Sequence, residues 1–169
     1  MANTQYSVIS GAQSIISANK VLKNTYMLLA ATLGFSALTA VISMALALPK
    51  GPEIIATAFA GTGLIFLGLS GYALTSKRNF SFMGGFLFAG VMVVFIAAIA
   101  NIFFAMPALS LAISAGIILL MSGFILFDTS RIINGGETNY IMATYGIYLN
   151  LFNIFISLLQ ILGIMGSDD

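Results

Sequence analysis

Histidine and cysteine are absent from this chain of 169 residues, and their absence removes many of the side chains on which enzymes depend. Without cysteine the chain has no disulfide and no thiolate nucleophile, and without histidine it has no imidazole base. The usual zinc and haem ligand sets are missing for the same reason. We therefore expect a protein that is not an enzyme and that holds no metal and no cofactor.

Charged side chains are also scarce. Six basic and five acidic residues make up 7% of the chain, whereas 60% of its residues are hydrophobic. Soluble domains carry about a quarter charged residues, and this chain has too few to cover a core in water. Its net charge of +1 does not indicate a surface for nucleic acid. The composition predicts an integral membrane protein whose main partner is the lipid bilayer.

Five apolar segments follow a polar N-terminal arm. Each has the roughly 20 residues that a helix needs to cross about 30 Å of hydrocarbon. Proline, glycine and charged residues separate them, in "PKGP", "SKRNFS", Pro107 and "NGGET". We predict an all-α helical membrane bundle, with a cytoplasmic arm over residues 1–24 and a transmembrane domain over residues 25–169. The spans are expected at residues 25–48, 54–75, 82–106, 108–127 with an extension to 133, and 141–165.

The basic residues predict the orientation in the membrane. With the N-terminus inside, five of the six basic residues lie in the cytoplasm and only Lys50 lies outside. Cytoplasmic loops of membrane proteins carry an excess of lysine and arginine. Five crossings then place the C-terminus outside.

Small and polar residues mark the faces on which membrane helices pack. At 100° per residue, small residues form one face in each of the first two spans: Ala30, Gly34 and Ala37, then Gly61, Gly68 and Gly71. The last span carries a polar stripe within roughly 80° of arc, formed by Gly146, Asn150, Asn153, Ser157 and Gln160. The stripe indicates either interhelical hydrogen bonds or a hydrated path or ligand site.

Two motifs bear on chemistry. "GLSG", at residues 68–71, has the form seen around the serine of rhomboid intramembrane proteases, but the base that such a serine needs is missing. Asp128 ends a run of uncharged residues that begins at Asn79, near the inner end of the fourth span. Arg131 follows three residues later, close enough to pair with it on a helix. Asp128 is therefore either half of an interfacial ion pair or a gate whose charge responds to cytoplasmic pH.

The stretches "KVLKNTYMLLAATLGFSALTAVIS" and "ALTSKRNFSF", and above all "FDTSRIINGGETNYI", resemble the Bax inhibitor-1 (transmembrane Bax inhibitor motif) family, and most closely its bacterial branch. The resemblance covers nearly the whole chain from Lys20 onward. It implies a family fold of seven transmembrane helices, of which the second and third are absent here, between Pro49 and Pro52. It also implies a place in the bacterial inner membrane.

The resemblance further implies a regulatory protein that binds and modulates a membrane ATP-dependent protease of the FtsH type. The N-terminal arm is then the segment that the protease engages. The alternative is a pH-sensitive calcium or proton leak, in which two aspartates form the sensor. Asp128 corresponds to the first aspartate and Asn150 to the second, so the pair is broken here. We expect Asp128 to be hydrogen-bonded to Asn150 or to Arg131.

Overall fold

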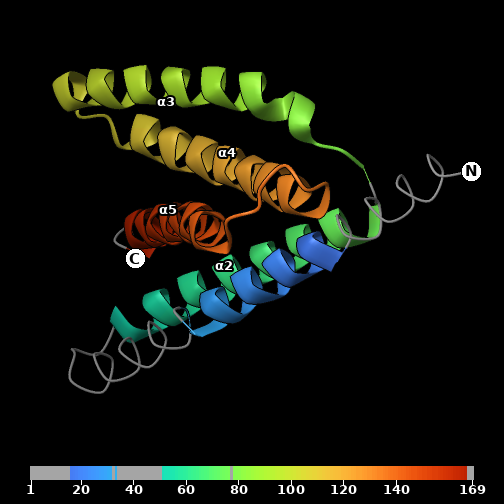
Figure 1. Ribbon diagram of the computed structural model, residues 1–169. Coiled ribbons are helices and arrows are strands. Elements are labelled where there is room, and N and C mark those ends of the chain that lie inside the picture. The colour runs from blue at the N-terminus through green and yellow to red at the C-terminus, as the bar shows by residue number, and fades with distance from the viewer. Residues whose placement is uncertain (1–15, 32, 34–50, 77, 167–169) are drawn as a thin grey trace, which may run out of the picture.

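The computed structural model of the chain describes residues 16–31, 33, 51–76 and 78–166, and no strand occurs among them (Figure 1). This confirms the all-α prediction. Residues 34–48 of the first predicted span and residues 1–15 of the arm lie outside the described residues. The described elements are the helical N-terminal segment (residues 16–31), α2 (Gly51–Ser76), the 3₁₀ turn η1 (Ser81–Met83), α3 (Gly84–Phe104), α4 (Pro107–Ile133) and α5 (Tyr140–Gly166).

Four of the described helices, α2 to α5, are long and apolar enough to cross a membrane. They confirm the last four predicted spans, with ends shifted by a few residues. α2 begins at Gly51 because Pro52 fits the first helical turn, where a missing N–H leaves no helical bond unmade. α3 ends at Phe104 because Ala105 adopts a left-handed conformation (φ 48°) and donates its N–H to the Asn101 carbonyl at 2.8 Å.

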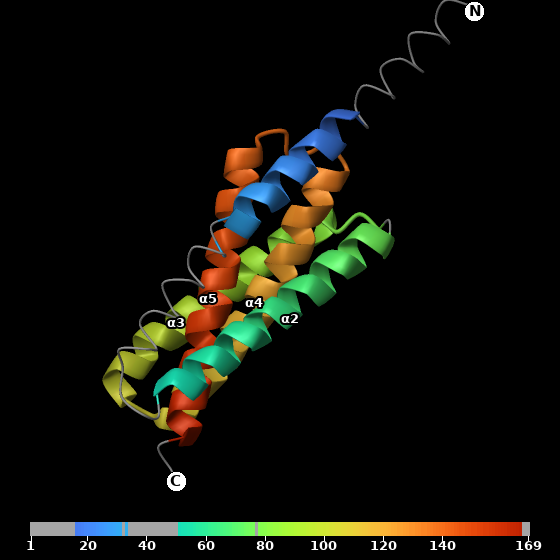
Figure 2. The ribbon, with the colours of Figure 1, turned by 90° about the horizontal axis from the view of Figure 1, so that it is seen from below.

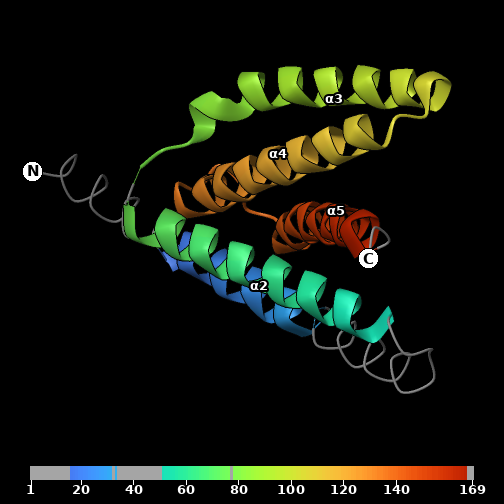
Figure 3. The ribbon, with the colours of Figure 1, turned by 180° about the vertical axis from the view of Figure 1, so that it is seen from behind.

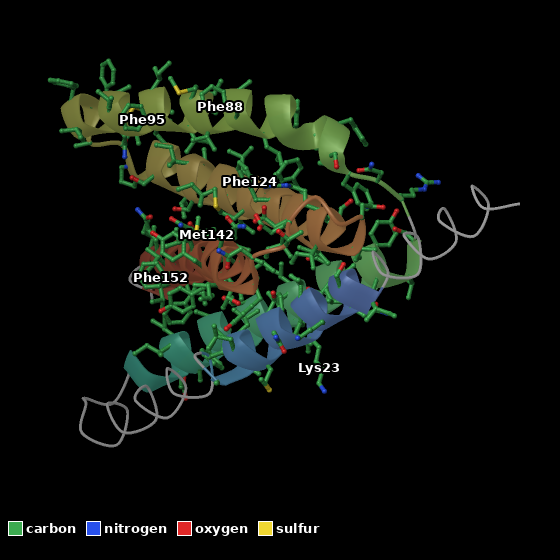
Figure 4. All side chains as sticks on the ribbon, viewed as in Figure 1. Lys23, Phe88, Phe95, Phe124, Met142 and Phe152 are labelled. Atoms are coloured by element: carbon green, nitrogen blue, oxygen red, sulfur yellow. The ribbon has the colours of Figure 1, made fainter. Side chains whose placement is uncertain are left out.

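α4 lies between α3 on one side and α2 and α5 on the other (Figures 1 and 3). Among the described elements, α3 packs only against α4 and η1. Phe88 and Phe95 lie on α3 and are 67% and 59% exposed (Figure 4). Lipid tails are as apolar as these side chains, so a helix in this position can leave most of its surface to the bilayer.

The N-terminal segment runs beside α2, at the side of the bundle away from α3 (Figures 1 and 3). It begins within the predicted arm and continues as one helix into the predicted first span. Its Tyr26 ring stacks on the Phe66 ring of α2, with the centroids 5.8 Å apart. The buried apolar core draws on the N-terminal segment, α2, α4 and α5, and it consists of Leu29, Phe66, Ile125, Ile132, Ala143, Ile147, Leu151 and Ile154.

Glycines let α3 and α4 approach closely, and the arrangement is reciprocal. A Cβ added at Gly123 of α4 would lie 2.6 Å from Cδ2 of Leu87, which is a buried side chain of α3. In the opposite direction, Leu120 of α4 fills the space above Gly90 of α3. Van der Waals contact at small residues is the main attraction between helices in lipid. No sequence pattern had predicted this interface.

The small-residue face predicted on α2 is only partly used. A Cβ at Gly61 would lie 3.3 Å from Leu158 of α5, but one at Gly68 or Gly71 would meet no described atom within 4 Å. The prediction of a packing face along all three glycines is therefore wrong for Gly68 and Gly71. The two helices cross at an angle and diverge toward the C-terminal end of α2 (Figure 2), so they keep contact over only part of their length. Gly34 and Ala37, on the other predicted face, lie outside the described residues.

Candidate functional site

The turn between α4 and α5 determines how the two helices face each other. At the end of α4, the Gly136 N–H donates to the Arg131 carbonyl at 2.8 Å and the Gly135 N–H to the Ile132 carbonyl at 3.2 Å. Gly135 has φ +73°, a conformation that glycine adopts without steric cost. These two bonds and the left-handed residue form a Schellman motif, which ends the helix and satisfies its last carbonyls.

Asn139 starts the next helix. Its Oδ1 accepts hydrogen bonds from the backbone N–H groups of Ile141 at 3.0 Å and Met142 at 3.4 Å, so it caps the free N–H groups of the first turn. The turn is short and closed at both ends. It therefore brings α5 back antiparallel along α4, with the polar side of α5 toward its neighbour.

Asp128 and Asn150 meet across the α4–α5 interface. The Asn150 Nδ2 donates to Oδ2 of Asp128 at 2.9 Å, and Asn150 is 8% exposed. Gly146, one turn earlier on α5, makes room for the carboxylate, since a Cβ at this position would lie 3.3 Å from the same Oδ2. The predicted hydrogen bond between Asp128 and Asn150 is present in the structure.

Arg131 does not form the ion pair with Asp128 that was one of the sequence interpretations. Its Nη2 lies 3.6 Å from Oε2 of Glu137, and its guanidinium lies over the Phe127 ring at 5.7 Å from the centroid. The turn after α4 folds back and brings Glu137 within reach of Arg131. The arginine is thus held at the partly exposed rim, while Asp128 is turned toward α5.

The residues of the polar stripe on α5 differ in what they contact. Ser114 of α4 donates its hydroxyl to Oε1 of Gln160 at 2.8 Å, which makes a second polar contact between the helices. Ser157 is buried, at 3% exposed. Asn153 is exposed, and its Nδ2 donates to the Leu149 carbonyl of its own helix at 2.8 Å. Of the predicted stripe, Asn150 and Gln160 therefore make interhelical hydrogen bonds, and Asn153 makes none to another described helix.

Two further contacts tie other segments to this end of the bundle, and no sequence pattern had indicated them. The Phe80 N–H, in the linker before α3, donates to the Ser130 hydroxyl at 2.9 Å. The buried Thr25 of the N-terminal segment donates to the Tyr140 carbonyl at 3.5 Å. The Thr144 hydroxyl donates to the same carbonyl at 2.6 Å and lies 3.4 Å from the Thr25 carbonyl. The N-terminal segment and the linker are thereby fastened beside the α4–α5 turn.

The chemistry of this arrangement is that of a partly buried carboxyl group held by an amide. Asn150 can only donate its N–H to the carboxylate and cannot exchange a proton with it. Within the described residues there is no group of three or more histidine, cysteine, aspartate or glutamate side chains that could bind a metal ion. The site therefore offers hydrogen bonding between α4 and α5.

Comparison with known proteins extends these observations. The family model for the inhibitor of apoptosis-promoting Bax1 matches residues 44–167. A Vibrio cholerae protein described as an uncharacterized membrane protein is 40% identical over 223 aligned residues, which span the whole of both chains. The Escherichia coli K12 protein named modulator of FtsH protease YccA is 42% identical over 207 aligned residues, covering 92% of this chain and 94% of the relative.

A third relative, an uncharacterized protein of Pseudomonas aeruginosa, is 51% identical over 129 residues, which are 76% of this chain and 58% of the relative. The alignment with the Vibrio protein is longer than the 169 residues of this chain, so it contains gaps in this chain. The match of the family model and the extent of these identities agree with the resemblance in the sequence. The chain belongs to the Bax inhibitor-1 family.

Proposed function

We propose that this membrane protein binds an FtsH-type membrane ATP-dependent protease and modulates it. The observation that carries the proposal is the 42% identity, over 92% of the chain, to the E. coli protein named as a modulator of FtsH protease. A pH-sensitive calcium or proton leak has less support, because the hydrogen-bonding partner of Asp128 is the amide of Asn150 and not a second carboxylate. The proposed location is the bacterial inner membrane.

We propose that the end of the bundle with the α4–α5 turn faces the cytoplasm. The contacts of Ser130 and Thr25 bring the N-terminal segment, the α2–α3 linker and this turn together. Lys20, Lys23 and Arg78 at this end are exposed, and Lys23 projects away from the bundle (Figure 4). An excess of basic residues favours the cytoplasmic side. The C-terminus then lies on the opposite side.

Single cysteines test this orientation, since the chain has none of its own. Asn139→Cys places a thiol in the α4–α5 turn, and Met106→Cys places one in the α3–α4 connection, where Met106 is 50% exposed. In intact cells, a membrane-impermeant maleimide should label Met106→Cys and should reach Asn139→Cys only after the cells are opened. The reverse pattern would show that the N-terminus lies outside.

We further propose that the arm over residues 1–24 is the segment that the protease engages. Exposed terminal segments are the usual starting points for proteolytic machines. The structure adds that the helix continuing from this arm is fastened at Thr25 to the first turn of α5, so a pull on the arm would act on an anchored helix. Removal of the arm leaves Thr25 in the chain but takes away Val21 and Leu22, which pack against the core.

Co-purification tests the proposal. We expect FtsH to co-purify with the full chain. We expect the same of a variant that carries Lys20→Gln and Lys23→Gln, which keeps the arm but removes the charges of these two side chains. Deletion of residues 1–24 should reduce the recovered FtsH at least several-fold. Deletion of residues 1–15 alone shows whether the residues before the described helix are required for the binding. Circular dichroism of each variant controls for the loss of the bundle. Equal recovery of FtsH with and without the arm would contradict this role.

The loss of the second and third family helices between Pro49 and Pro52 is also a proposal. The gaps in the alignment with the full-length Vibrio relative support an internal loss. A helical hairpin is a unit of two crossings, so its removal leaves the orientation of α2 to α5 unchanged. Sequencing the source gene across these codons tests whether a hairpin is encoded there.

A further inference from the structure

Three buried hydroxyl groups have no hydrogen-bond partner among the described residues. They belong to Tyr26 in the N-terminal segment, Ser70 in α2 and Thr129 in α4. Ser70 is 3% exposed and Thr129 is fully buried. Inside a membrane, a buried hydroxyl cannot form a hydrogen bond with bulk water. A hydroxyl without a protein partner is therefore unfavourable. Three of them in one small bundle call for a physical explanation.

Other hydroxyls in the same helix do find partners. Thr62 and Thr75 of α2 each donate to the carbonyl four residues earlier, at 2.8 Å. This is the ordinary way in which a helix satisfies a serine or threonine in an apolar environment. Ser70 and Thr129 have the same option and do not use it in the structure. Both hydroxyls are thus left without a partner in their own helices.

The first two residues are both neighbours of Phe66 on α2. The Tyr26 ring stacks on the Phe66 ring with an angle of 28° between the planes. Ser70 follows Phe66 by one helical turn, so both lie on the same face of α2. That face is turned into the bundle, since Phe66 and Ala73 on it are buried as well.

The third hydroxyl belongs to a residue of α4 that borders the same core. Thr129 lies one turn from both Ile125 and Ile132, which are fully buried and belong to the same core as Phe66. α2 packs directly against α4. Thr129 also directly follows Asp128, whose carboxylate is bound by Asn150. Three helices thus each bury an unpaired hydroxyl in or beside the core that contains Phe66, Ile125 and Ile132.

We propose that Tyr26, Ser70 and Thr129 form an internal hydration site, in which their hydroxyls bind ordered water at the junction of the N-terminal segment, α2 and α4. Water suits this set because each hydroxyl can donate one hydrogen bond and accept others, and water can do the same toward two or more partners. The site extends the polar layer that begins at Asp128 and Asn150. It is independent of the proposed protease binding.

Removal of the hydroxyls tests the site. Thr129→Val and Ser70→Ala remove the polar atom and leave most of the side-chain volume. If both groups bind the same water, each substitution should raise the unfolding equilibrium constant about fivefold, and the double variant should raise it by clearly less than the product of the two. Tyr26→Phe is expected to behave like the single variants. Thr62→Val, whose hydroxyl bonds to its own helix, is the matched control and should have little effect.

The opposite result is equally distinct. If the hydroxyls lie in a dry core, their removal relieves an unfavourable burial. Each substitution should then lower the unfolding equilibrium constant, and the double variant should lower it by the product of the two single factors. A second measurement needs no variant: magnetisation transfer from water in solid-state NMR of the protein in lipid bilayers. Transfer to Thr129 and Ser70 is expected, and its absence at both sites, while exposed Thr75 shows it, would overturn the proposal.

Discussion

The hydrogen bond between Asp128 and Asn150 can be tested by removing one partner and then both. Asn150→Leu takes away the amide that donates to Oδ2 of Asp128 at 2.9 Å. A buried acceptor left without its donor costs about 1–3 kcal/mol, although bonds between membrane helices average only about 0.6 kcal/mol. Because the donor is 8% exposed and the acceptor is a carboxyl group, we expect a loss of about 1–2 kcal/mol in the free energy of unfolding.

The double variant gives the sharper expectation. Asp128→Leu alone should also destabilise the bundle, since it leaves the buried Asn150 amide unpaired. When both residues are leucine, no polar group is left unsatisfied, and the two side chains can pack against each other. The double variant should therefore lose less than the sum of the two single losses, with a coupling of about 1 kcal/mol or more.

Unfolding is followed by circular dichroism as a mild detergent is replaced by a denaturing one. Asn153→Leu is the matched control, because Asn153 lies on the same helix, is exposed and, among the described residues, bonds to the backbone of its own helix alone. It should change the free energy of unfolding by no more than about 0.5 kcal/mol. If the losses from Asp128→Leu and Asn150→Leu simply add, the two side chains do not act as a pair and the reasoning fails.

Two glycine positions give further expectations. Gly123→Ala should destabilise the α3–α4 interface by about 1–2 kcal/mol, because overpacking against the buried Leu87 outweighs the higher helix propensity of alanine. Gly85→Ala is the control, since a Cβ there would meet no described atom within 4 Å. Equal stability of the two variants would contradict the close approach of α3 and α4. Gly135→Ala should cost about 1–2 kcal/mol, since φ +73° crowds a Cβ against the following carbonyl. Gly136→Ala should be tolerated, as its Cβ would make only ordinary contacts from 3.6 Å, and thermal unfolding of both variants checks the difference.

Much of the fold could be predicted from the sequence. The scarcity of charge and the length of the apolar segments depend on local composition, and the solvation of a helix by lipid follows from composition alone. Four spans were therefore located to within a few residues, and "NGGET" correctly marked the end of α4. The stripe on α5 pointed to Asn150 and Gln160, because a helix repeats its faces at a known angle.

The tertiary structure decided which of these residues meet. Asp128 had two candidate partners at equally plausible positions, and only the rotation of α4 against α5, set by the turn through Gly135 and Asn139, gave it Asn150. The same turn brought Glu137 back to Arg131. These outcomes depend on crossing angles and on the path of a loop, which no single segment encodes.

The sequence by itself thus determined the solvent, the helices and the polar faces of this protein, since each follows from the free energy of placing one segment in hydrocarbon. Only the tertiary structure decided that the glycines of α3 and α4 pack closely while Gly68 and Gly71 do not, and that three hydroxyls are buried without a partner among the described residues. The reason is physical. Helices in lipid all bury similar apolar surface, so close contact and the pairing of a few polar groups select one arrangement among many.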